Sequence, residues 1–343
     1  MKAVFLTGHG GNEIVSIGER PHPVRRPGEV LVRMQAATLN RVDLYMRDSG
    51  AGITHTLPQI MGVDGAGIVE EVGDDEIQLR PGQQVVLHPC IACGRCEFCL
   101  RGDDILCANA KLLGEHRDGT FAEYVSLPAR NVLPRPKYLD AVEAAALGVC
   151  HLTAWRMLFT QARVQAGETV LIFGIGGGVS MAALQLAKMA GARVIVTSRE
   201  RATLDIAATL KADHCIHSGS EDIARTVQEI TGGRGVDIVI ENVGAAVWST
   251  AMKSLVRGGR LVTCGATTGS QPGADLQRLF IRQLKVFGST LGNLSEHRAL
   301  LEACERNGLR PRIDRRYTLD QAHDALTWLE AQKQIGKLAL NIA

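Results

Sequence analysis

The sequence lacks an excess of charge of either sign. Its 343 residues include 38 lysines and arginines against 36 aspartates and glutamates, so the formal net charge is +2. A balance this close does not indicate a protein that binds nucleic acids or membrane surfaces by electrostatic attraction. We therefore expect neither a nucleic acid nor a membrane among its partners.

Long hydrophobic runs are also missing. No stretch approaches the 18 or so apolar residues that a membrane-spanning helix needs. The N-terminal segment, MKAVFLTGHGGNEIV, has neither the basic start nor the continuous apolar stretch of a secretory signal. The protein is therefore expected in the cytoplasm, where clustered cysteines bind metal more often than they form disulfides.

Disordered and low-complexity compositions are excluded as well. Hydrophobic residues make up 45% of the chain and charged residues 22%, as in ordinary globular proteins, and the length predicts about two domains. Glycine and cysteine stand out, with 37 glycines and nine cysteines, five of which fall between Cys90 and Cys107. The glycines indicate tight turns or close backbone approaches, and the clustered cysteines indicate a metal site.

The first 130 residues are predicted to be rich in β-strands. Short apolar or alternating runs are separated by glycine and proline, and Arg80-Pro81-Gly82 marks a turn between two of them. The expected strands cover residues 29–39, 65–73, 83–88 and 121–127.

The pattern changes near residue 168 to alternating strands and helices. Near-continuous β-branched runs between helices predict a parallel sheet covered on both faces, which is the doubly wound arrangement. The six expected strands are 169–174, 193–198, 214–217, 236–244, 260–265 and 285–292, with helices at 179–192, 200–211, 221–231 and 246–256. The fold class is therefore α/β, with a six-stranded parallel sheet after a β-rich half.

The tail from Asn293 contains two predicted helices, 295–306 and 319–332, and a last strand, 337–342. It lacks the further strand–helix unit that would extend the parallel sheet. We therefore expect the tail to return to the N-terminal domain.

A glycine-rich turn lies between the first strand and the first helix of the alternating half. The first glycine permits a tight turn, and those after it let backbone N–H groups approach a pyrophosphate at the helix N-terminus. This context favours a dinucleotide site over a plain turn whose small residues serve packing, although the third glycine of the G-x-G-x-x-G motif falls at Val179 or Ser180. The residues expected to contact the cofactor here are Gly174, Gly176, Gly177, Gly178 and Val179.

The end of the second strand predicts which nucleotide binds. A site for NAD places Asp or Glu about 20 residues after the glycines, where it accepts from the ribose 2′-hydroxyl. Here the strand ends in Ser198, which carries no charge to repel a 2′-phosphate, and Arg199 or Arg201 is placed to bind that phosphate. NADPH is therefore favoured over NADH, although both arginines are also compatible with a solvated helix start.

Four cysteines are spaced to hold one metal ion. Cys93, Cys96, Cys99 and Cys107 follow the pattern C-x₂-C-x₂-C-x₇-C, which lets one loop surround a tetrahedral Zn²⁺ and leaves no coordination position open for water. The predicted site is therefore one structural zinc per chain, with an iron–sulfur centre or disulfides as the alternatives. Cys90 lies outside this spacing.

Together these motifs resemble the zinc-containing medium-chain alcohol dehydrogenase superfamily. The resemblance covers nearly the whole chain and includes GVDGAGIVEEVG (62–73), GTFAEYV (119–125), LTAWRML (152–158) and GRLVTCGATTG (259–269). It implies a GroES-like catalytic domain formed by residues 1–125 and 292–343, with the zinc loop at 90–107, and a Rossmann domain at 126–291, with the nicotinamide between them. It also implies that the residues near the cofactor include Thr153, Val243, Gly265 and Leu291, and that the chain forms a homodimer or a dimer of dimers through the edge strand.

The resemblance further implies a catalytic zinc held by a cysteine, a histidine and a third cysteine or acid. This sequence departs from that pattern, because Asn40 replaces the first cysteine, Val63 replaces the histidine, and Val149 stands at the third position. Asn40 instead matches a quinone oxidoreductase branch of the superfamily, in which the same segment continues with an aspartate and a tyrosine, here Asp43 and Tyr45. The residues that could still supply a substitute ligand are Asp64, Cys150 and His151.

The loss of this zinc changes the expected chemistry. Unactivated alcohols need a Lewis acid to stabilise the alkoxide, whereas quinones and α,β-unsaturated carbonyls spread the developing charge and need only a hydrogen-bond donor. Asn40 can donate from its amide and Tyr45 from its phenol, while Asp43 either joins the site or binds neighbouring backbone. We therefore predict an NADPH-dependent reductase of a quinone or an α,β-unsaturated carbonyl that works without a catalytic metal.

Two other functions fit the sequence. One is a zinc-type alcohol dehydrogenase with an altered set of catalytic ligands, and the other is a nucleotide-binding protein without enzymatic turnover. The metal content separates the reductase from the alcohol dehydrogenase, because one zinc per chain supports the reductase and two support the alcohol dehydrogenase.

Overall fold

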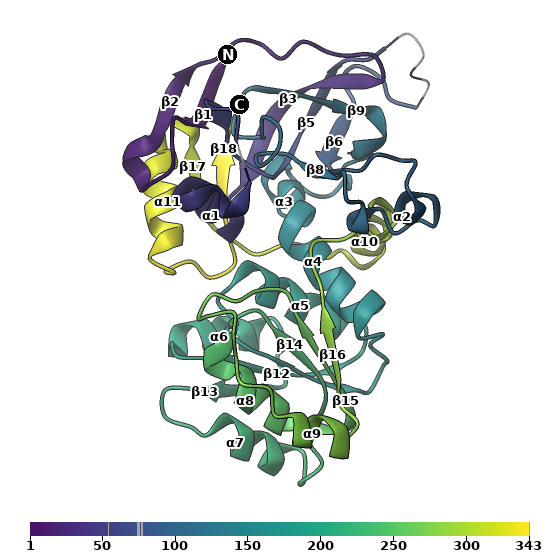
Figure 1. Ribbon diagram of the computed structural model, residues 1–343, viewed down its shortest axis with the longest axis vertical. Helices are drawn as coiled ribbons and strands as arrows, with labels where there is room; N and C mark the ends of the chain where they lie inside the picture. Colours follow the sequence, from purple (N-terminus) through teal and green to yellow (C-terminus); the bar gives the residue numbers. More distant parts are fainter. Residues whose placement is uncertain (54, 74–75, 77, 343) are drawn as a thin grey trace. The chain divides into compact units, whose positions relative to one another are not determined.

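The computed structural model describes residues 1–53, 55–73, 76 and 78–342, which form two compact units (Figure 1). The first unit consists of residues 1–152 and 292–343, and the second of residues 153–291. Helix α4 (Leu152–Trp155) spans the point where the chain passes from the first unit to the second.

The first unit is built around a seven-stranded sheet. Its strands follow the order β10-β6-β5-β3-β18-β17, and β9 also pairs with β3. A three-stranded sheet, β2-β1-β4, and a two-stranded one, β7-β8, complete the β-structure. The strands are β1 (Lys2–Leu6), β2 (Val15–Glu19), β3 (Glu29–Thr38), β4 (Gln59–Ile60), β5 (Asp64–Glu71), β6 (Gln84–Leu87), β7 (Cys90–Ile91), β8 (Lys111–Leu112), β9 (Tyr124–Pro128), β10 (Val132–Pro134), β17 (Ile313–Thr318) and β18 (Lys337–Asn341), and the helices are α1 (Arg41–Ser49), α2 (Glu97–Leu100), α3 (Ala141–Ala145), α10 (Leu294–Asn307) and α11 (Ala322–Glu330).

The tail returns to this unit, as predicted. Strand β18 pairs antiparallel with β3, with Leu340 opposite Ala37, and parallel with β17. Its side chains are buried from Lys337 to Leu340, and Leu338 and Leu340 join the apolar cluster beneath α1 and α11. The last strand therefore lies in the interior of the sheet rather than at its edge.

The boundary between the units differs from the predicted one. Residues 126–152 were expected in the Rossmann domain, but they belong to the first unit. The reason is long-range pairing, because β9 binds β3 and β10 binds β6. The sequence of residues 126–152 gives no local signal for such pairing.

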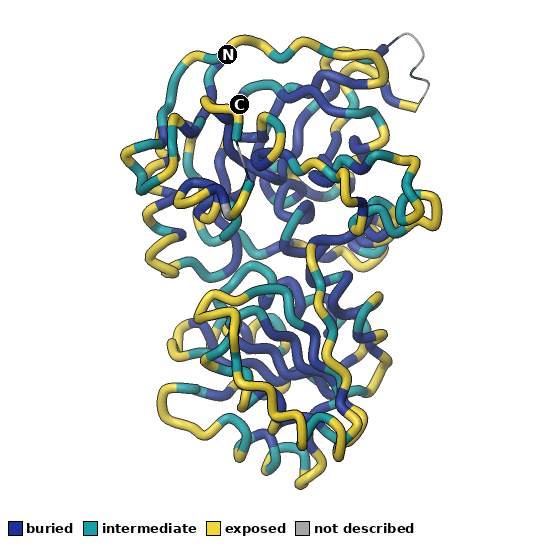
Figure 2. Tube along the Cα trace, in the orientation of Figure 1, coloured by how far each residue is buried: buried dark blue, intermediate teal, exposed yellow. Residues whose placement is uncertain are grey.

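The second unit contains the six-stranded parallel sheet that the sequence predicts. The strand order is β13-β12-β11-β14-β15-β16. From β11 the sheet grows toward β13 on one side, and from β14 it grows toward β16 on the other, so the order switches between β11 and β14, as in doubly wound folds. Figure 2 shows the central strands of this sheet as buried. The strands are β11 (Thr169–Ile172), β12 (Arg193–Ser198), β13 (His214–His217), β14 (Val236–Glu241), β15 (Leu255–Thr263) and β16 (Lys285–Gly288), and the helices are α5 (Gly178–Met189), α6 (Arg201–Thr209), α7 (Ile223–Ile230), α8 (Ala245–Ser254) and α9 (Leu276–Ile281).

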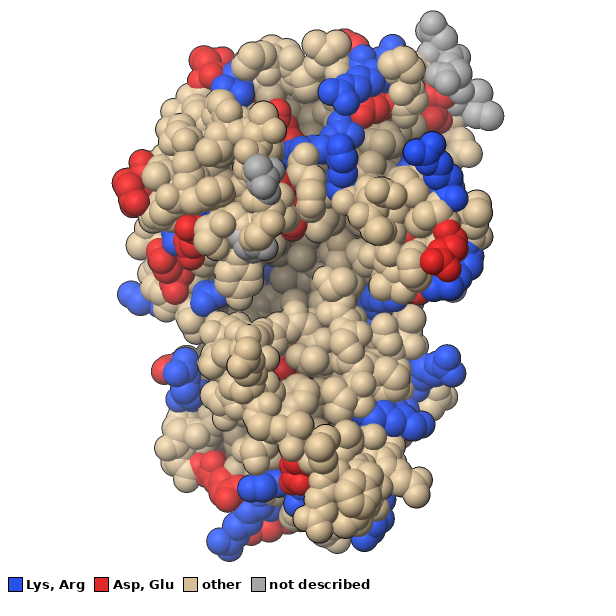
Figure 3. Space-filling view, viewed as in Figure 1, with Lys and Arg blue, Asp and Glu red and all other residues tan. Residues whose placement is uncertain are grey.

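Two surface properties bear on the partners. Among the described residues, no helix is long and apolar enough to cross a membrane. On the face drawn in Figure 3, basic and acidic side chains are interspersed over both units, and the described residues there form no continuous basic stripe.

Candidate functional site

Asn40 lies where β3 ends and α1 begins, and it is the N-cap of that helix. The Asp43 carboxylate, three residues later, accepts a hydrogen bond of 2.6 Å from the Asn40 backbone N–H, which is one half of a capping box. Asp43 is 2% exposed, and burial raises the pKa of its carboxyl to about 8. Asp43 therefore binds neighbouring backbone, which is one of the two roles that the sequence left open.

Every polar atom of the Asn40 side chain has a partner within the first unit. Its amide nitrogen donates to Asp64 Oδ2 at 3.1 Å and to the Thr38 carbonyl at 3.2 Å. Its Oδ1 accepts from Lys337 Nζ at 2.6 Å and lies 3.4 Å from Cys150 Sγ. In this arrangement the Asn40 amide is held in one orientation and has no N–H left for a substrate.

Asp64 fixes the other side of this network. The carboxylate is fully buried, and its Oδ1 accepts from the Thr38 backbone N–H at 3.1 Å and from the Thr38 hydroxyl at 2.7 Å. Its Oδ2 receives the Asn40 amide and lies 3.7 Å from Lys337 Nζ. A buried carboxylate is stabilised by a nearby cation or by several hydrogen-bond donors, and Asp64 has both.

Lys337 supplies that cation, and sequence reasoning missed it. Its side chain is 3% exposed, and its ammonium donates to the Leu39 carbonyl at 2.7 Å, in addition to its bond to Asn40. Burial alone would lower the pKa of this ammonium, but the neighbouring Cys150, Asp64 and Asp43 outweigh burial and raise it. The available signal was a lysine opening the otherwise apolar strand KLAL.

Tyr45 does not join this network. It lies on α1 and is 40% exposed, and no hydrogen bond is found for its hydroxyl within the described part of the chain. Of the three predicted catalytic residues, the structure therefore brings Asn40 and Asp43 together, while Tyr45 presents its ring to solvent.

The four predicted zinc ligands form a compact cluster. The sulfurs of Cys93, Cys96, Cys99 and Cys107 all lie within 4.8 Å of one another. Sulfurs at the corners of a tetrahedron with Zn–S bonds of about 2.3 Å are separated by about 3.8 Å. The distances of 3.5 Å between Cys96 and Cys99 and 3.9 Å between Cys93 and Cys99 fit that size, and Cys90 lies outside the cluster.

The cluster also has partners suited to thiolates. Backbone N–H groups of Arg95 and Cys96 lower the pKa of the Cys93 thiol to about 6, whereas burial raises the pKa of the Cys99 thiol to about 12. The Cys93 N–H donates to Cys107 Sγ at 3.5 Å. Four sulfur donors at these distances fit a structural Zn²⁺, which these residues would hold with no position left for a substrate.

The glycine turn has the geometry of a phosphate-binding loop. Gly174 adopts a φ of +62°, and a Cβ there would lie 3.2 Å from Val243 Cγ2. Gly177 is the N-cap of the 12-residue helix α5 and has no side chain to cap it, so the first N–H groups of the helix are left for a ligand. Gly176, Gly178 and Val179 lie in the same turn and first helical positions, so the five predicted residues all fall within the segment 174–179.

The residues expected to choose the nucleotide lie beside this turn, at the end of β12. Ser198 is half-buried and Arg199 is exposed. The Ser198 hydroxyl accepts from the Glu200 N–H at 3.1 Å, and the Arg199 carbonyl is paired with His217 Nε2 at 2.7 Å. Position 198 therefore holds a neutral hydroxyl in place of an acid. The backbone of Arg199 is held by its bond to His217, and its side chain is exposed.

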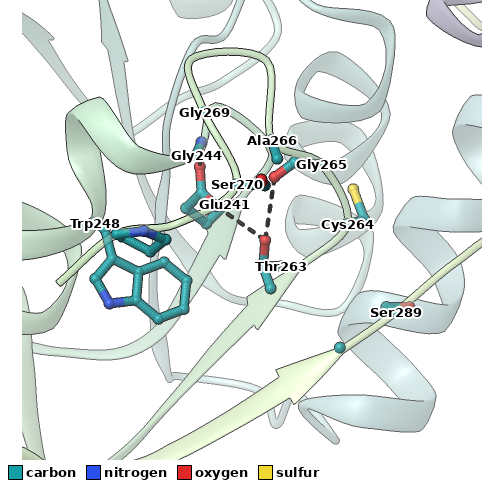
Figure 4. A pocket seen from close by; sticks show the side chains of 12 residues that line it. Glu241, Gly244, Trp248, Thr263, Cys264, Gly265, Ala266, Gly269, Ser270 and Ser289 are labelled. Carbon is teal, nitrogen blue, oxygen red and sulfur yellow. Dashed lines mark hydrogen bonds between the residues drawn. The ribbon is translucent and has the colours of Figure 1, made fainter. Parts of the chain in front are cut away.

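A pocket of about 410 Å³ opens at the carboxyl ends of β14 and β15. Gly265 lines it, and Figure 4 shows Glu241 bound to Thr263, with Trp248 and Ser289 on opposite sides. The buried Glu241 carboxylate accepts from the N–H groups of Val243 and Gly244 and so fixes the turn after β14. Two further predicted cofactor residues are buried elsewhere in this unit, Thr153 at its start and Leu291 at its end.

Known sequences and structures place the chain in a family. The pattern described as "Alcohol dehydrogenase GroES-like domain" matches residues 26–137, and the one described as "Zinc-binding dehydrogenase" matches residues 178–306. An NAD-dependent alcohol dehydrogenase from Saccharolobus solfataricus is 30% identical, over 99% of both chains. The protein belongs to the zinc-binding dehydrogenase family.

Two other members of this family are similar over nearly their whole length. A crystal structure of an NAD-dependent alcohol dehydrogenase has 38% identity and a TM-score of 0.97, with complete coverage of both chains. A quinone oxidoreductase from Rattus norvegicus is 27% identical over 99% of this chain and 97% of its own. The predicted family and fold class are confirmed, and the protein is an oxidoreductase of this family.

The catalytic zinc that the family implies does not fit the residues present. Val63 is a buried aliphatic side chain, the Asn40 amide is fully bonded, and burial raises the pKa of the Cys150 thiol. Lys337 already places a positive charge among these groups. The Nδ1 of His151 is paired with the Ala146 carbonyl at 3.1 Å.

Proposed function

We propose that this zinc-binding dehydrogenase transfers a hydride from NADPH to a quinone or an α,β-unsaturated carbonyl, without a catalytic metal. One observation carries the proposal. Two of the three positions at which the family places its catalytic ligands hold valines, Val63 and Val149. The third holds Asn40, whose side chain is bonded to Asp64 and to the Lys337 ammonium. This set holds a cation of its own instead of the two or three anionic or imidazole donors that a catalytic Zn²⁺ needs.

The chemistry follows from that charge. NADPH, when bound, supplies the hydride, which forms a C–H bond at the β-carbon of the acceptor while the π electrons move to its oxygen. The positive charge of Lys337, which Asn40 holds in place, favours the negative charge that develops on the oxygen of the acceptor. The Tyr45 hydroxyl is proposed to donate the hydrogen bond to that oxygen, and a proton from solvent completes the saturated carbonyl.

The test is a comparison of acceptors and donors. We expect the purified protein to oxidise NADPH with a quinone or an α,β-unsaturated ketone, and to leave primary and secondary alcohols unchanged in the presence of NADP⁺ or NAD⁺. Alcohol oxidation that depends on a second zinc per chain would instead favour the alcohol dehydrogenase hypothesis. Binding of NADPH without turnover across the panel would favour a nucleotide-binding protein.

The choice of NADPH rests on the end of β12. Replacing Ser198 by aspartate should lower the ratio of kcat/KM for NADPH to that for NADH by at least about tenfold, which corresponds to about 1.4 kcal/mol. The new carboxylate would repel the 2′-phosphate and accept from a free 2′-hydroxyl. Steady-state kinetics with both nucleotides measure the ratio.

Thr209→Asp is the matched control for this substitution. It adds the same charge to the exposed end of α6, away from the strand end, and should leave the ratio unchanged. A Ser198→Asp variant that keeps its preference would argue that position 198 does not face the 2′-phosphate.

A further inference from the structure

Strand β12 ends between the glycine turn and the end of β13, and both neighbours bind it through backbone hydrogen bonds. The two strands pair in parallel, with Ser198 opposite His217, and the Ser218 N–H donates to the Ser198 carbonyl at 2.9 Å. On the other side, the Ile175 N–H in the glycine turn donates to the Thr197 carbonyl at 3.0 Å. The end of β12 is therefore held from both sides.

The His217 side chain adds a further bond to this frame. Its Nε2 lies 2.7 Å from the Arg199 carbonyl, and because a carbonyl oxygen only accepts, Nε2 carries the proton and donates this hydrogen bond. The other ring nitrogen, Nδ1, is paired with the Ser220 hydroxyl at 2.8 Å. A Cβ on Gly219 would lie 3.0 Å from Cε1 of the ring, so the loop after β13 packs closely against it. Both ring nitrogens are thus engaged within the protein, and neither is left for a ligand.

The bond from His217 matters because of the side chain that Arg199 carries. The Arg199 side chain is exposed and forms no ion pair within the described part of the chain. It lies at the strand end where a doubly wound sheet binds the adenosine ribose. A guanidinium on a fixed backbone loses less conformational entropy when it binds a phosphate than one on a mobile backbone.

We propose that His217 is a positioning residue for the 2′-phosphate of NADPH, and that it acts by fixing the backbone of Arg199 rather than by contacting the phosphate. The inference rests on the proposed function in taking NADPH as the nucleotide. It goes beyond that function by assigning part of the nucleotide specificity to β13, outside the strand that carries the charge. NADH has no 2′-phosphate, so its binding should not depend on His217.

His217→Phe tests this role, because it keeps a ring and removes both of the side-chain bonds. The probes are adenosine 2′,5′-bisphosphate and AMP, which differ by the 2′-phosphate alone, and calorimetry gives the dissociation constant of each. We expect the variant to bind the bisphosphate about three- to tenfold more weakly, the loss that one hydrogen bond of ordinary strength produces, and to bind AMP as the natural protein does. In steady-state kinetics the loss should fall on KM for NADPH rather than on kcat.

Two further variants separate positioning from packing. His217→Gln keeps an N–H donor in place of Nε2 and should restore most of the affinity for the bisphosphate. His214→Phe is the matched control, because it removes an imidazole that is bonded to Arg193 at 2.6 Å from the opposite end of the same strand. This control should leave both dissociation constants unchanged.

Two results would overturn the proposal alone. One is a His217→Phe variant that keeps the natural ratio of the two dissociation constants, and the other is an equal loss of affinity for both probes in a natural protein that prefers the bisphosphate. A natural protein that binds both probes equally would refute the choice of NADPH together with this inference. A natural protein that prefers the bisphosphate but reduces no quinone or enone would refute the proposed reaction and leave the role of His217 standing, because the binding comparison involves no acceptor.

Discussion

Replacement of Lys337 by methionine should lower the free energy of unfolding of the first unit by about 3–5 kcal/mol, the usual cost of breaking a buried ion pair by removing one partner. Asp64 is completely buried, and without the ammonium its charge would be opposed only by the donors from Thr38 and Asn40. Hydrogen exchange of peptides from β3 and β18, followed across a denaturant series, measures the loss in the unit concerned.

Two comparisons separate charge from packing. Lys337→Met/Asp64→Asn removes both charges and should recover most of the loss, because a neutral amide can keep part of the same network. Lys188→Met breaks the half-exposed pair with Asp213, whose atoms are 2.7 Å apart, and should cost only about 0–1 kcal/mol. Equal losses for Lys337→Met and Lys188→Met would show that burial adds nothing to the first pair.

Cys96→Ser should abolish zinc binding and lower the Tm by about 8–16 °C. Loss of a structural metal is among the few changes that cost more than about 4 kcal/mol, and each kcal/mol shifts the Tm of a domain of 150–250 residues by about 2–4 °C. We expect this drop in Tm because the loop from Cys93 to Cys107 contains only two short elements, α2 and a single 3₁₀ turn. The fold of the loop therefore depends on the metal. Zinc analysis and differential scanning calorimetry on the same samples measure both effects.

Cys90→Ala is the control for the zinc prediction. Cys90 is a buried neighbour of the loop but lies outside the cluster of four sulfurs, so this variant should keep its zinc and lose stability only through packing. A Cys96→Ser protein that retains one zinc, or that loses it with no change in Tm, would contradict a structural role for the metal.

Features encoded by neighbouring residues were predictable. The cysteine loop and the glycine turn each depend on a segment of fewer than about 20 residues, and both have the geometry that their spacing indicates. The six parallel strands were equally accessible, because buried strands and covering helices alternate along the sequence.

Features that depend on distant pairing were not. The family position of Asn40 and its amide group predict a donor to the substrate, but its partners come from β5 and, 297 residues away, from Lys337. The predicted boundary between the units is wrong for the same reason. Strands β9 and β10 belong to the first unit because they pair with β3 and β6. A sequence pattern shows that a lysine begins an apolar strand, but not which carboxylate it meets.

The position of β18 has a consequence for biosynthesis. This strand is inserted between β3 and β17, and it carries the lysine that neutralises Asp64. Because the ribosome makes the chain from its N-terminus, residues 1–152 emerge with that carboxylate and with the central strand β3 still lacking a neighbour. A product truncated before Lys337 would therefore lack the strand that covers one edge of β3 and the cation that lies beside Asp64.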